Sequence, residues 1–358
     1  MTEHISFFSQ GKYGCVTHPA ISCKNKKSVP NFSSSVSKIV INDFYAKNEI
    51  NVGILLNEVL KKPLYSSMKE SFLIYTEYCV LKNNELKNEK NQMIQNKCKL
   101  IDTNLSDEEF NNRFVALYGK YVPSTTLFIY LKQQPSWDKL FHFYKFSLQV
   151  CRTLNKINLI HYDLKETNFL HKSKTNKFYI IDFGFSLQYD KCFLENELNM
   201  KYLKHFFIYA PEYVYWSLDH NIISYIIKYI KVDFTEKSLK EIIDESYKHR
   251  VFQNDFCDDL TAYKKDCFIF FKEILFTSSM KTNEDRISFL LKKYAKTWDL
   301  YSICVICLKT IINNLNSDCI INQNNFVSLL KNGVHYDYSV RPSLTNHMSA
   351  FFDMLSNK

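Results

Sequence analysis

The chain contains little glycine or proline, with 6 glycines and 7 prolines among 358 residues. Both residues punctuate local structure, so each of the few that are present should have a local reason. The sequence also has no apolar run of the roughly 18–20 residues that a membrane-spanning helix needs. Its start, MTEHISFFSQ, lacks the apolar segment of a secretory signal, so we expect a cytoplasmic protein with no membrane contact.

Long blocks of like charge are missing as well. The net charge is +9, but Lys and Arg are scattered along the chain. A nucleic-acid partner is therefore less well supported than a solvated basic surface, or attraction for a polyanion such as a nucleotide. Hydrophobic residues make up 46% and charged residues 23%, which is typical of a folded protein, and 358 residues suffice for a substantial core in two domains or lobes.

Cysteine, by contrast, is present in an odd number, 11. Without a secretory signal these residues are predicted to be mostly reduced and buried. Cys304 and Cys307 form a lone CxxC pair inside an apolar run, with no second pair to complete a zinc site. Core packing on one helix face is the preferred interpretation, and no metal is assigned to cysteine.

Local patterns divide the chain into a strand-rich front and a helix-rich back. Apolar spacing predicts helices over about 42–60, with Asn42 or Asp43 as N-cap, and over 137–157. Residues 81–113, rich in Asn, Lys and Glu, are predicted to be an insertion or mobile loop. We predict strands within residues 1–41, 71–81 and 124–134, and mainly helix from about 213 onward. The expected fold class is α+β with two unequal lobes.

Two acidic motifs follow apolar runs, HYDLKETN at 161–168 and IIDFG at 180–184. Their residue types suit phosphoryl transfer, in which catalysis is largely the positioning of charge. Asp163 would accept the proton of the attacking hydroxyl, and Lys165 would neutralise the transferred group. Asp182 and Asn168 offer the hard oxygen ligands that Mg²⁺ prefers.

These motifs resemble the catalytic loop and the Mg²⁺ loop of protein kinases. The stretch SQGKYGCV is similar to the family's phosphate-covering loop, with Gly11 and Gly14 at two glycine positions and Val16 over the base. Ser9 stands where the first glycine is usual, which departs from the pattern. The resemblance implies ATP and Mg²⁺ as cofactors, bound in a cleft between the lobes.

The strand VSKIV resembles the one whose lysine contacts the α- and β-phosphates, which makes Lys38 that residue. The long step from the glycine-rich loop implies an insertion within about 18–34. Lys38 should pair with a glutamate of the following helix; we choose Glu49, with Glu58 as the alternative. The hinge that meets adenine through backbone groups is expected at Tyr130, Leu131 and Lys132.

Two further segments resemble scaffold motifs of the family. IYAPEYV is similar to the end of the activation segment, and its Glu212 is expected to form a buried ion pair with Arg341. KTWDLYSICVICL resembles the central helix of the large lobe, whose Asp299 would hold the catalytic-loop backbone. The domain limits that follow are a kinase domain at 1–345 (N-lobe 1–132 with an insertion at 81–113, C-lobe 133–345 with an insertion at 213–298) and a tail at 346–358.

The sequence departs from the family at Tyr162, where an Arg that receives an activation-loop phosphate is usual. The segment 182–212 has no Thr and one Ser, Ser186, beside the Mg²⁺ motif. We therefore predict an enzyme that does not need phosphorylation of this segment. Three tyrosines remain as candidate modification sites: Tyr189, Tyr202 and Tyr209.

Lys165 two residues after Asp163 is typical of Ser/Thr-directed kinases, so the expected activity is phosphorylation of Ser/Thr in protein substrates. The stretches GCVTHPAISC and NEINVGILL and the HYDLK form are similar to those of Ser/Thr kinases of large nucleocytoplasmic DNA viruses, a resemblance that would place the protein in host cytoplasm or virion. Three alternatives stay open: a small-molecule phosphotransferase of the choline or aminoglycoside kinase type, a pseudokinase scaffold, and a basic nucleic-acid-binding protein. The insertion at 213–298 is either a partner-docking element or extra scaffold.

Overall fold

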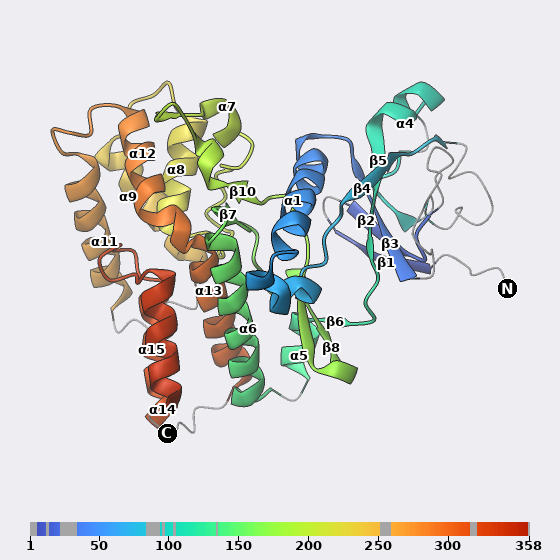
Figure 1. The fold of residues 1–358 in the computed structure, drawn as a ribbon. Helices are drawn as coiled ribbons and strands as arrows, with labels where there is room; N and C mark the ends of the chain where they lie inside the picture. The colour runs from blue at the N-terminus through green and yellow to red at the C-terminus, as the bar shows by residue number, and fades with distance from the viewer. Residues whose placement is uncertain are drawn as a thin grey trace. The chain divides into compact units, whose positions relative to one another are not determined.

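The computed structural model describes residues 6–11, 14–21, 34–83, 94, 97–102, 105–133, 135–250, 259–315 and 321–356. The fold is mixed α+β, with an antiparallel sheet in the N-terminal part and mainly helices in the C-terminal part (Figure 1). The chain divides into two compact units, the first made of residues 1–125 and 169–186 and the second of 126–168 and 187–358. The boundary predicted at 132 does not anticipate the return of 169–186 to the first unit.

The first unit is built on a five-stranded sheet with strand order β1-β2-β3-β5-β4, all pairs antiparallel. Strand β3 pairs with β5 along its whole length, from Ser35 opposite Lys120 to Ile41 opposite Phe114. The predicted strands before residue 41 are confirmed for the described part. The elements of this unit are β1 (Ser6–Gln10), β2 (Gly14–His18), β3 (Ser35–Ile41), α1 (Phe44–Leu60), η2 (Pro63–Ser71), β4 (Glu77–Val80), α4 (Asp107–Arg113), β5 (Phe114–Lys120), β8 (Phe169–Lys172), η4 (Ser173–Thr175) and β9 (Lys177–Ile180).

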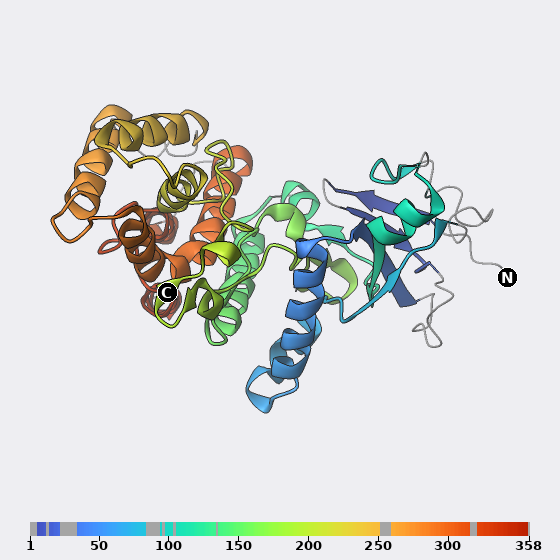
Figure 2. The ribbon, with the colours of Figure 1, turned by 90° about the horizontal axis from the view of Figure 1, so that it is seen from above.

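Helix α1 begins where the sequence predicts it. The Asp43 carboxylate accepts the backbone N–H groups of Tyr45 and Ala46, which caps the helix. Gly53 has a local reason, because a Cβ there would lie 2.0 Å from the carbonyl oxygen of Tyr75. Helix α1 follows β3 directly in the first unit (Figures 1 and 2). It packs on the sheet through a small apolar cluster made of Val40, Ala46, Ile50, Val115 and Leu117.

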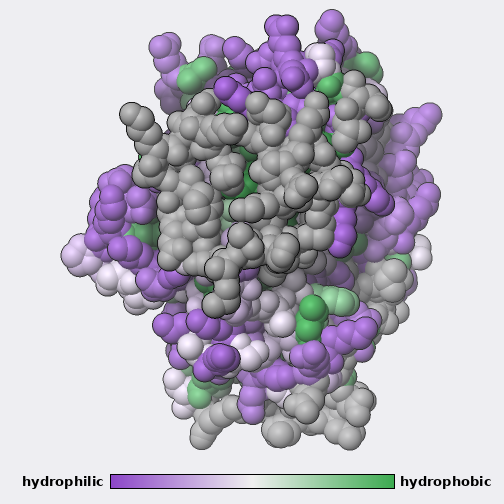
Figure 3. Space-filling view, turned by 90° about the vertical axis from the view of Figure 1, so that its right-hand side faces the viewer, coloured by the Kyte–Doolittle hydropathy of each residue, from purple (hydrophilic) through white to green (hydrophobic). Residues whose placement is uncertain are grey.

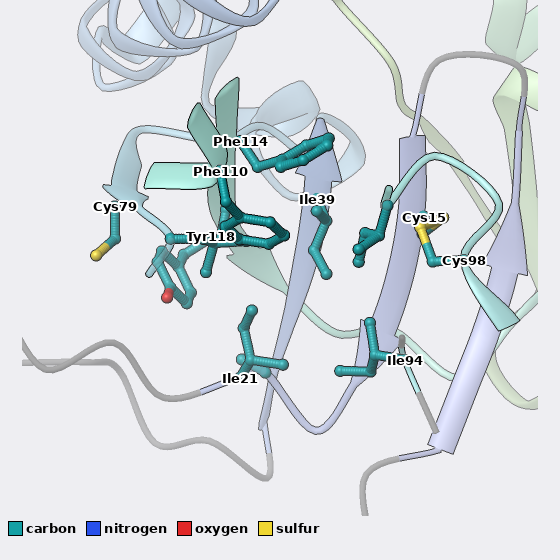
Figure 4. Packing of buried hydrophobic residues seen from close by; sticks show 13 residues of the cluster. Cys15, Ile21, Ile39, Cys79, Ile94, Cys98, Phe110, Phe114 and Tyr118 are labelled. Carbon is teal, nitrogen blue, oxygen red and sulfur yellow. A yellow bond between two sulfur atoms is a disulfide. The ribbon is translucent and has the colours of Figure 1, made fainter. Parts of the chain in front are cut away.

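The predicted insertion at 81–113 contributes to the core of the first unit. Leu81, Ile94 and Phe110 are each 0–1% exposed and join a cluster with residues of β2, β3 and β5 (Figure 4). The interpretation as a mobile loop is therefore wrong for these described residues, because few apolar residues suffice when each one is fully buried. The predicted insertion within 18–34 lies mostly outside the described residues.

The same cluster contains a disulfide between Cys15 and Cys98, which lie 83 positions apart in sequence and whose Cα atoms are 5.9 Å apart (Figure 4). Cys79 is disulfide-bonded as well. The prediction of mostly reduced cysteines is wrong for these residues, because a pairing across such a separation leaves no spacing signal. The cysteines that are free and buried are Cys151, Cys192, Cys267, Cys304 and Cys307, so the core role of the CxxC pair is confirmed.

The second unit is mainly helical. Its long helices α6 and α13 lie side by side (Figure 1), and α8 packs on α9 and α12. The predicted insertion at 213–298 supplies α8, α9, α11 and α12, so its described part is mainly helical. The elements are α5 (Leu127–Lys132), α6 (Trp137–Asn155), β7 (Leu159–Ile160), η3 (Glu166–Asn168), β10 (Leu187–Gln188), η5 (Tyr189–Cys192), β11 (Phe193–Leu194), β12 (Glu197–Leu198), α7 (Met200–Leu203), α8 (Leu218–Lys228), α9 (Glu236–His249), α11 (Leu260–Leu275), α12 (Asn283–Tyr294), η6 (Ala295–Thr297), α13 (Trp298–Asn314), α14 (Ile321–Gly333) and α15 (Leu344–Ser356).

Two predictions for this region are wrong. The expected strand at 124–134 is reduced to β6 (Thr125–Thr126), after which Thr126 caps helix α5 by accepting the N–H of Ile129. The expected tail at 346–358 instead forms most of α15, whose His347 and Phe351 are buried. Apolar residues one helical turn apart bury one face in the second unit, which a tail would leave exposed.

No helix among the described residues is long and apolar enough to cross a membrane. On the face shown in Figure 3, the described surface is mainly hydrophilic, and its hydrophobic residues form small separate spots.

Candidate active site

The first unit brings Lys38, Glu49 and Asp182 together. The Nζ of Lys38 donates to both carboxylate oxygens of Glu49, at 2.9 and 2.8 Å, and to Oδ1 of Asp182 at 2.8 Å. Lys38 therefore pairs with Glu49, whereas Glu58 is exposed and bonds Lys61. In sequence, Glu49 lies 11 residues and Asp182 lies 144 residues from Lys38. Side chains from three separate segments therefore meet at the Lys38 ammonium group.

Burial and charge determine the protonation of this cluster. Burial lowers the pKa of Lys38, but the carboxylates of Asp182 and Glu49 outweigh it, so the pKa of this lysine lies above its ordinary value. The side chains of Lys38 and Glu49 are 12% and 4% exposed, whereas Asp182 is 38% exposed. Burial raises the pKa of Glu49 to about 7, with Lys38 opposing the rise and Asp182 adding to it, so the accessible carboxylate of the cluster is that of Asp182.

The Asp182 segment is held against α1 and η2 by contacts that the sequence analysis did not predict. The amide nitrogen of Asn48 donates to the carbonyl oxygens of Gly184 and Ser186, both at 2.9 Å. Phe183 is buried and stacks on Phe72, at 6.0 Å between ring centroids. No pattern in the sequence links Asn48 with a segment 136 residues away.

Asp182 adopts a backbone φ of +70°, the left-handed region that a non-glycine residue rarely visits. The surrounding contacts hold it there, and such backbone outliers concentrate at functional sites.

The predicted phosphate-covering loop lies at the turn between β1 and β2. The N–H of Gly11 donates to the carbonyl oxygen of Gly14 at 2.8 Å. A Cβ on Gly14 would lie 2.9 Å from Val40 and 3.0 Å from the carbonyl oxygen of Ile39, so close packing on β3 excludes a side chain. Val16, the residue predicted to cover the base, is directly opposite Lys38 in the β2–β3 register. Two residues of the loop, 12 and 13, are outside the described part.

The second unit brings Asp163, Lys165 and Asn168 together in the loop that follows β7. Lys165 donates to Oδ2 of Asp163 at 2.7 Å, and the amide nitrogen of Asn168 donates to the same oxygen at 3.1 Å. Asn168 also donates to the backbone carbonyl of Asp163 at 2.8 Å. The loop therefore fixes one carboxylate oxygen with a cation and an amide.

The other oxygen, Oδ1 of Asp163, accepts a hydrogen bond from the hydroxyl of Tyr213. Burial and the neighbouring Asp163 raise the pKa of Tyr213, so this hydroxyl keeps its proton and acts as the donor. Any hydroxyl group that approaches Oδ1 has to share or displace this contact. No pattern in the sequence identifies Tyr213, because it lies 50 residues from its partner.

Asp299 holds the backbone of this loop, as the resemblance implies. Its two oxygens accept the N–H groups of His161 at 2.8 Å and Tyr162 at 3.0 Å. Burial raises the pKa of Asp299, while His161 and the two backbone bonds oppose the rise. Tyr162 has a φ of +71°, so the two N–H bonds anchor a loop with an unfavourable backbone angle.

Tyr162 itself fills an aromatic cluster. Its side chain is 2% exposed, and its hydroxyl donates to the carbonyl of Phe206 at 3.3 Å. The rings around it are those of Phe206, Phe207, Trp216, His220 and Trp298.

Two predicted sites are wrong. Tyr130, Leu131 and Lys132 belong to helix α5, whose backbone groups bond along the helix and so do not form an extended hinge. Glu212 is exposed and does not pair with Arg341.

Arg341 is buried and bonds Asp219 instead, with Nη2 2.9 Å from Oδ1. Asp219 lies seven residues after Glu212, at the start of α8, and is 0% exposed.

Comparison of the chain with protein-family models and with functionally characterised proteins found no match.

Proposed function

We propose that the protein is an ATP- and Mg²⁺-dependent protein kinase that transfers the γ-phosphoryl group to Ser or Thr hydroxyls. The observation that carries this proposal is the Lys38 ammonium group held between Glu49 and Asp182. A buried ion pair of this kind adds little stability on balance, so its assembly from three distant segments is better explained by a ligand that it serves. The phosphates of a nucleotide suit the lysine, and a divalent cation suits the accessible carboxylate.

In this proposal Asp163 accepts the proton of the substrate hydroxyl as its oxygen attacks the γ-phosphorus. The Pγ–O bond to ADP breaks as the new bond forms, and Lys165 offsets the negative charge on the transferred group. Lys38 orients the α- and β-phosphates. Asp182 would hold Mg²⁺, whose charge would offset the negative charge of the phosphates.

The residues present fit a Mg²⁺ ion that arrives with the nucleotide. In the first unit, Asp182 offers a carboxylate that is 38% exposed. In the second unit, Asn168 uses its amide nitrogen for Asp163, and its amide oxygen is a hard ligand of the kind that Mg²⁺ prefers. Among the described residues, no three His, Cys, Asp or Glu side chains are grouped to hold a metal by themselves. Mg²⁺ commonly takes one or two protein oxygens and completes its shell with phosphates and water.

The surroundings of Tyr162 support an activity that needs no phosphorylation of the 182–212 segment. An Arg at this position would need an anionic partner to order the segment. Here the buried Tyr162 ring packs against Phe206 and Phe207 and ties that part of the segment to the loop of Asp163 by apolar contact and a hydrogen bond. Phosphatase treatment should therefore leave the activity unchanged, and its loss would contradict this interpretation.

A Glu212–Arg341 pair would have favoured a protein kinase over a small-molecule phosphotransferase, and Arg341 pairs with Asp219 instead. The spacing of Lys165 after Asp163 and the DFG form of the Asp182 motif still favour a protein substrate. A pseudokinase usually lacks the counterpart of Lys38, Asp163 or Asp182. Here all three are present, with partners that suit catalysis.

The test is transfer of labelled γ-phosphate from ATP–Mg²⁺ to myelin basic protein or casein, with choline and kanamycin as small-molecule acceptors. Asp163→Asn should lower kcat by about 10²–10⁴-fold, the range for loss of a general base. Asp182→Asn should abolish Mg²⁺-dependent transfer.

A matched pair on helix α1 provides the control. Glu49→Gln should lower activity strongly, whereas Glu58→Gln should leave it near wild type because Glu58 is 64% exposed and bonds only Lys61 among the described contacts. Equal effects of the two variants would contradict the role of the Lys38 cluster. Transfer to choline or kanamycin but not to protein would move the small-molecule function ahead.

A further inference from the structure

A cavity of about 650 Å³ opens on the second unit, between the chain that follows α7 and the C-terminal end of α8. Its floor contains Phe207 and Ile227, which are 4% and 5% exposed. Its rim carries two exposed apolar side chains, Ile208 at 42% and Val232 at 64%. Apolar side chains exposed together around a hollow are typical of a binding surface rather than of an ordinary polar surface.

The charges of the cavity have one sign. Lys204, Lys228 and Lys231 line it, and its lining includes no acidic residue. All three lysines are exposed. The Nζ of Lys228 lies over the rings of Tyr209 and Tyr229, at 5.6 and 5.1 Å from their centroids, which places its charge at the apolar rim.

Part of the lining is held in place from outside the cavity. The hydroxyl of Tyr209 donates to Glu245 on α9, and its ring meets Tyr225 of α8 edge-on at 5.4 Å. The cavity wall is therefore braced on two helices of the 213–298 region, and a ligand would meet a largely preformed surface.

The position along the chain connects this cavity with the candidate active site. Tyr209, which lines the cavity, lies four residues before Tyr213, and the Tyr213 hydroxyl donates to the carboxylate of Asp163. Both belong to the second unit.

We propose that this cavity docks a peptide segment of the protein substrate in which Asp or Glu side chains stand beside large apolar ones. The apolar side chains would cover Ile208 and Val232, and the carboxylates would meet Lys204, Lys228 and Lys231. This inference deepens the proposed kinase function and rests on it for the identity of the partner. It also gives the 213–298 region a role beyond scaffold.

The first experiment measures binding in the absence of ATP. The probe is a short fluorescein-labelled peptide in which Leu and Phe alternate with Glu and Asp and which has no Ser, Thr or Tyr. Fluorescence anisotropy with the full chain should show saturable binding that weakens as salt is raised. Lys228→Glu/Lys231→Glu should raise Kd at least about tenfold, because two attractive contacts become repulsive.

A matched variant controls for net charge. Lys240→Glu/Lys248→Glu reverses two exposed lysines of α9 that do not line the cavity, so the total charge changes equally. It should leave Kd within about twofold of wild type. Ile208→Ser/Val232→Ser keeps the lysines, and it should weaken binding through loss of apolar contact.

Three results would overturn the docking inference: equal binding of a matched peptide with Lys in place of Glu and Asp, equal weakening in both charge-reversed variants, or tighter binding of a single-stranded DNA oligonucleotide at the same lysines.

A second assay separates this inference from the proposed function. Phosphate transfer to a Ser-containing peptide with the acidic segment should show a raised KM and an unchanged kcat in Lys228→Glu/Lys231→Glu. Binding without any transfer would count against the kinase function alone, and transfer with no lysine dependence against the docking inference alone.

Discussion

The ion pair between Asp219 and Arg341 gives the sharpest test of the fold, because the sequence favours a different partner for Arg341. Its guanidinium group lies 2.9 Å from Asp219 and is 1% exposed, whereas Glu212 is exposed. We predict that Asp219→Asn destabilises the second unit strongly and that Glu212→Gln does not.

The magnitude follows from the contacts of Asp219. One oxygen accepts from Arg341, and the other accepts from the indole nitrogen of Trp298 at 2.6 Å and the hydroxyl of Ser217 at 2.8 Å. An asparagine in the same rotamer would turn an N–H₂ group towards the Trp298 donor or towards the cation. Breaking a buried pair from one side costs about 3–5 kcal/mol, since the remaining charge is left uncompensated. Replacing the exposed Glu212 by Gln should change the free energy of unfolding by no more than about 0.5 kcal/mol.

The assay is urea unfolding followed by tryptophan fluorescence and circular dichroism, with the midpoint and slope fitted for each variant. Arg341→Met in both backgrounds completes a double-mutant cycle. We expect a large coupling energy between Arg341 and Asp219, and none between Arg341 and Glu212. A Glu212→Gln variant that is destabilised as much as Asp219→Asn would refute the reasoning and restore the pairing that the sequence suggests.

Three further predictions concern the site and the stability of the fold. Tyr213→Phe should lower the KM for the protein acceptor by about tenfold with the KM for ATP unchanged, because the hydrogen bond to Asp163, worth about 1.5 kcal/mol, no longer competes; a hundredfold lower kcat at constant KM would instead make Tyr213 a positioning residue. Burial lowers the pKa of His220 to about 3, so this imidazole stays neutral in the folded chain at pH values below about 6.5, where it is protonated in the unfolded chain. Stability should therefore fall by about 1.4 kcal/mol per pH unit between pH 6 and 4 from this group, and an unchanged pH slope of the urea midpoint in His220→Gln would contradict the assignment. Cys98→Ser should destabilise the first unit by roughly 2–4 kcal/mol relative to the oxidised wild type, because the bond to Cys15 constrains a long segment of the unfolded chain; a variant and a wild type that unfold at the same urea concentration without reductant would show that the bond does not form in solution.

Local features of the fold were predictable from the sequence because their causes are local. Asp43 caps α1, and the apolar period of residues 137–157 places α6, since a cap and a periodic face are set within a few turns. The cluster of Asp163, Lys165 and Asn168 is also local, because its members share one loop. The choice of Glu49 over Glu58 came from the resemblance to kinases rather than from any spacing rule.

Contacts between distant segments were decided by the tertiary structure alone. Three sets of contacts have no signature in the sequence, because the fold and not the spacing brings the partners together. They are the hydrogen bond from Tyr213 to Asp163, the hydrogen bonds from Asn48 to the carbonyls of Gly184 and Ser186, and the Cys15–Cys98 disulfide. The strand predicted at 124–134 is wrong for a related reason. A short apolar run is compatible with strand or helix, and in this structure Thr126 caps helix α5 within that run.

The sequence by itself thus determined which acidic, basic and metal-ligating groups the chain offers, because these are properties of residue types. Only the tertiary structure decided which charges meet. A buried carboxylate such as Asp219 must have a partner, and the partner is whichever cation the packed helices bring within reach.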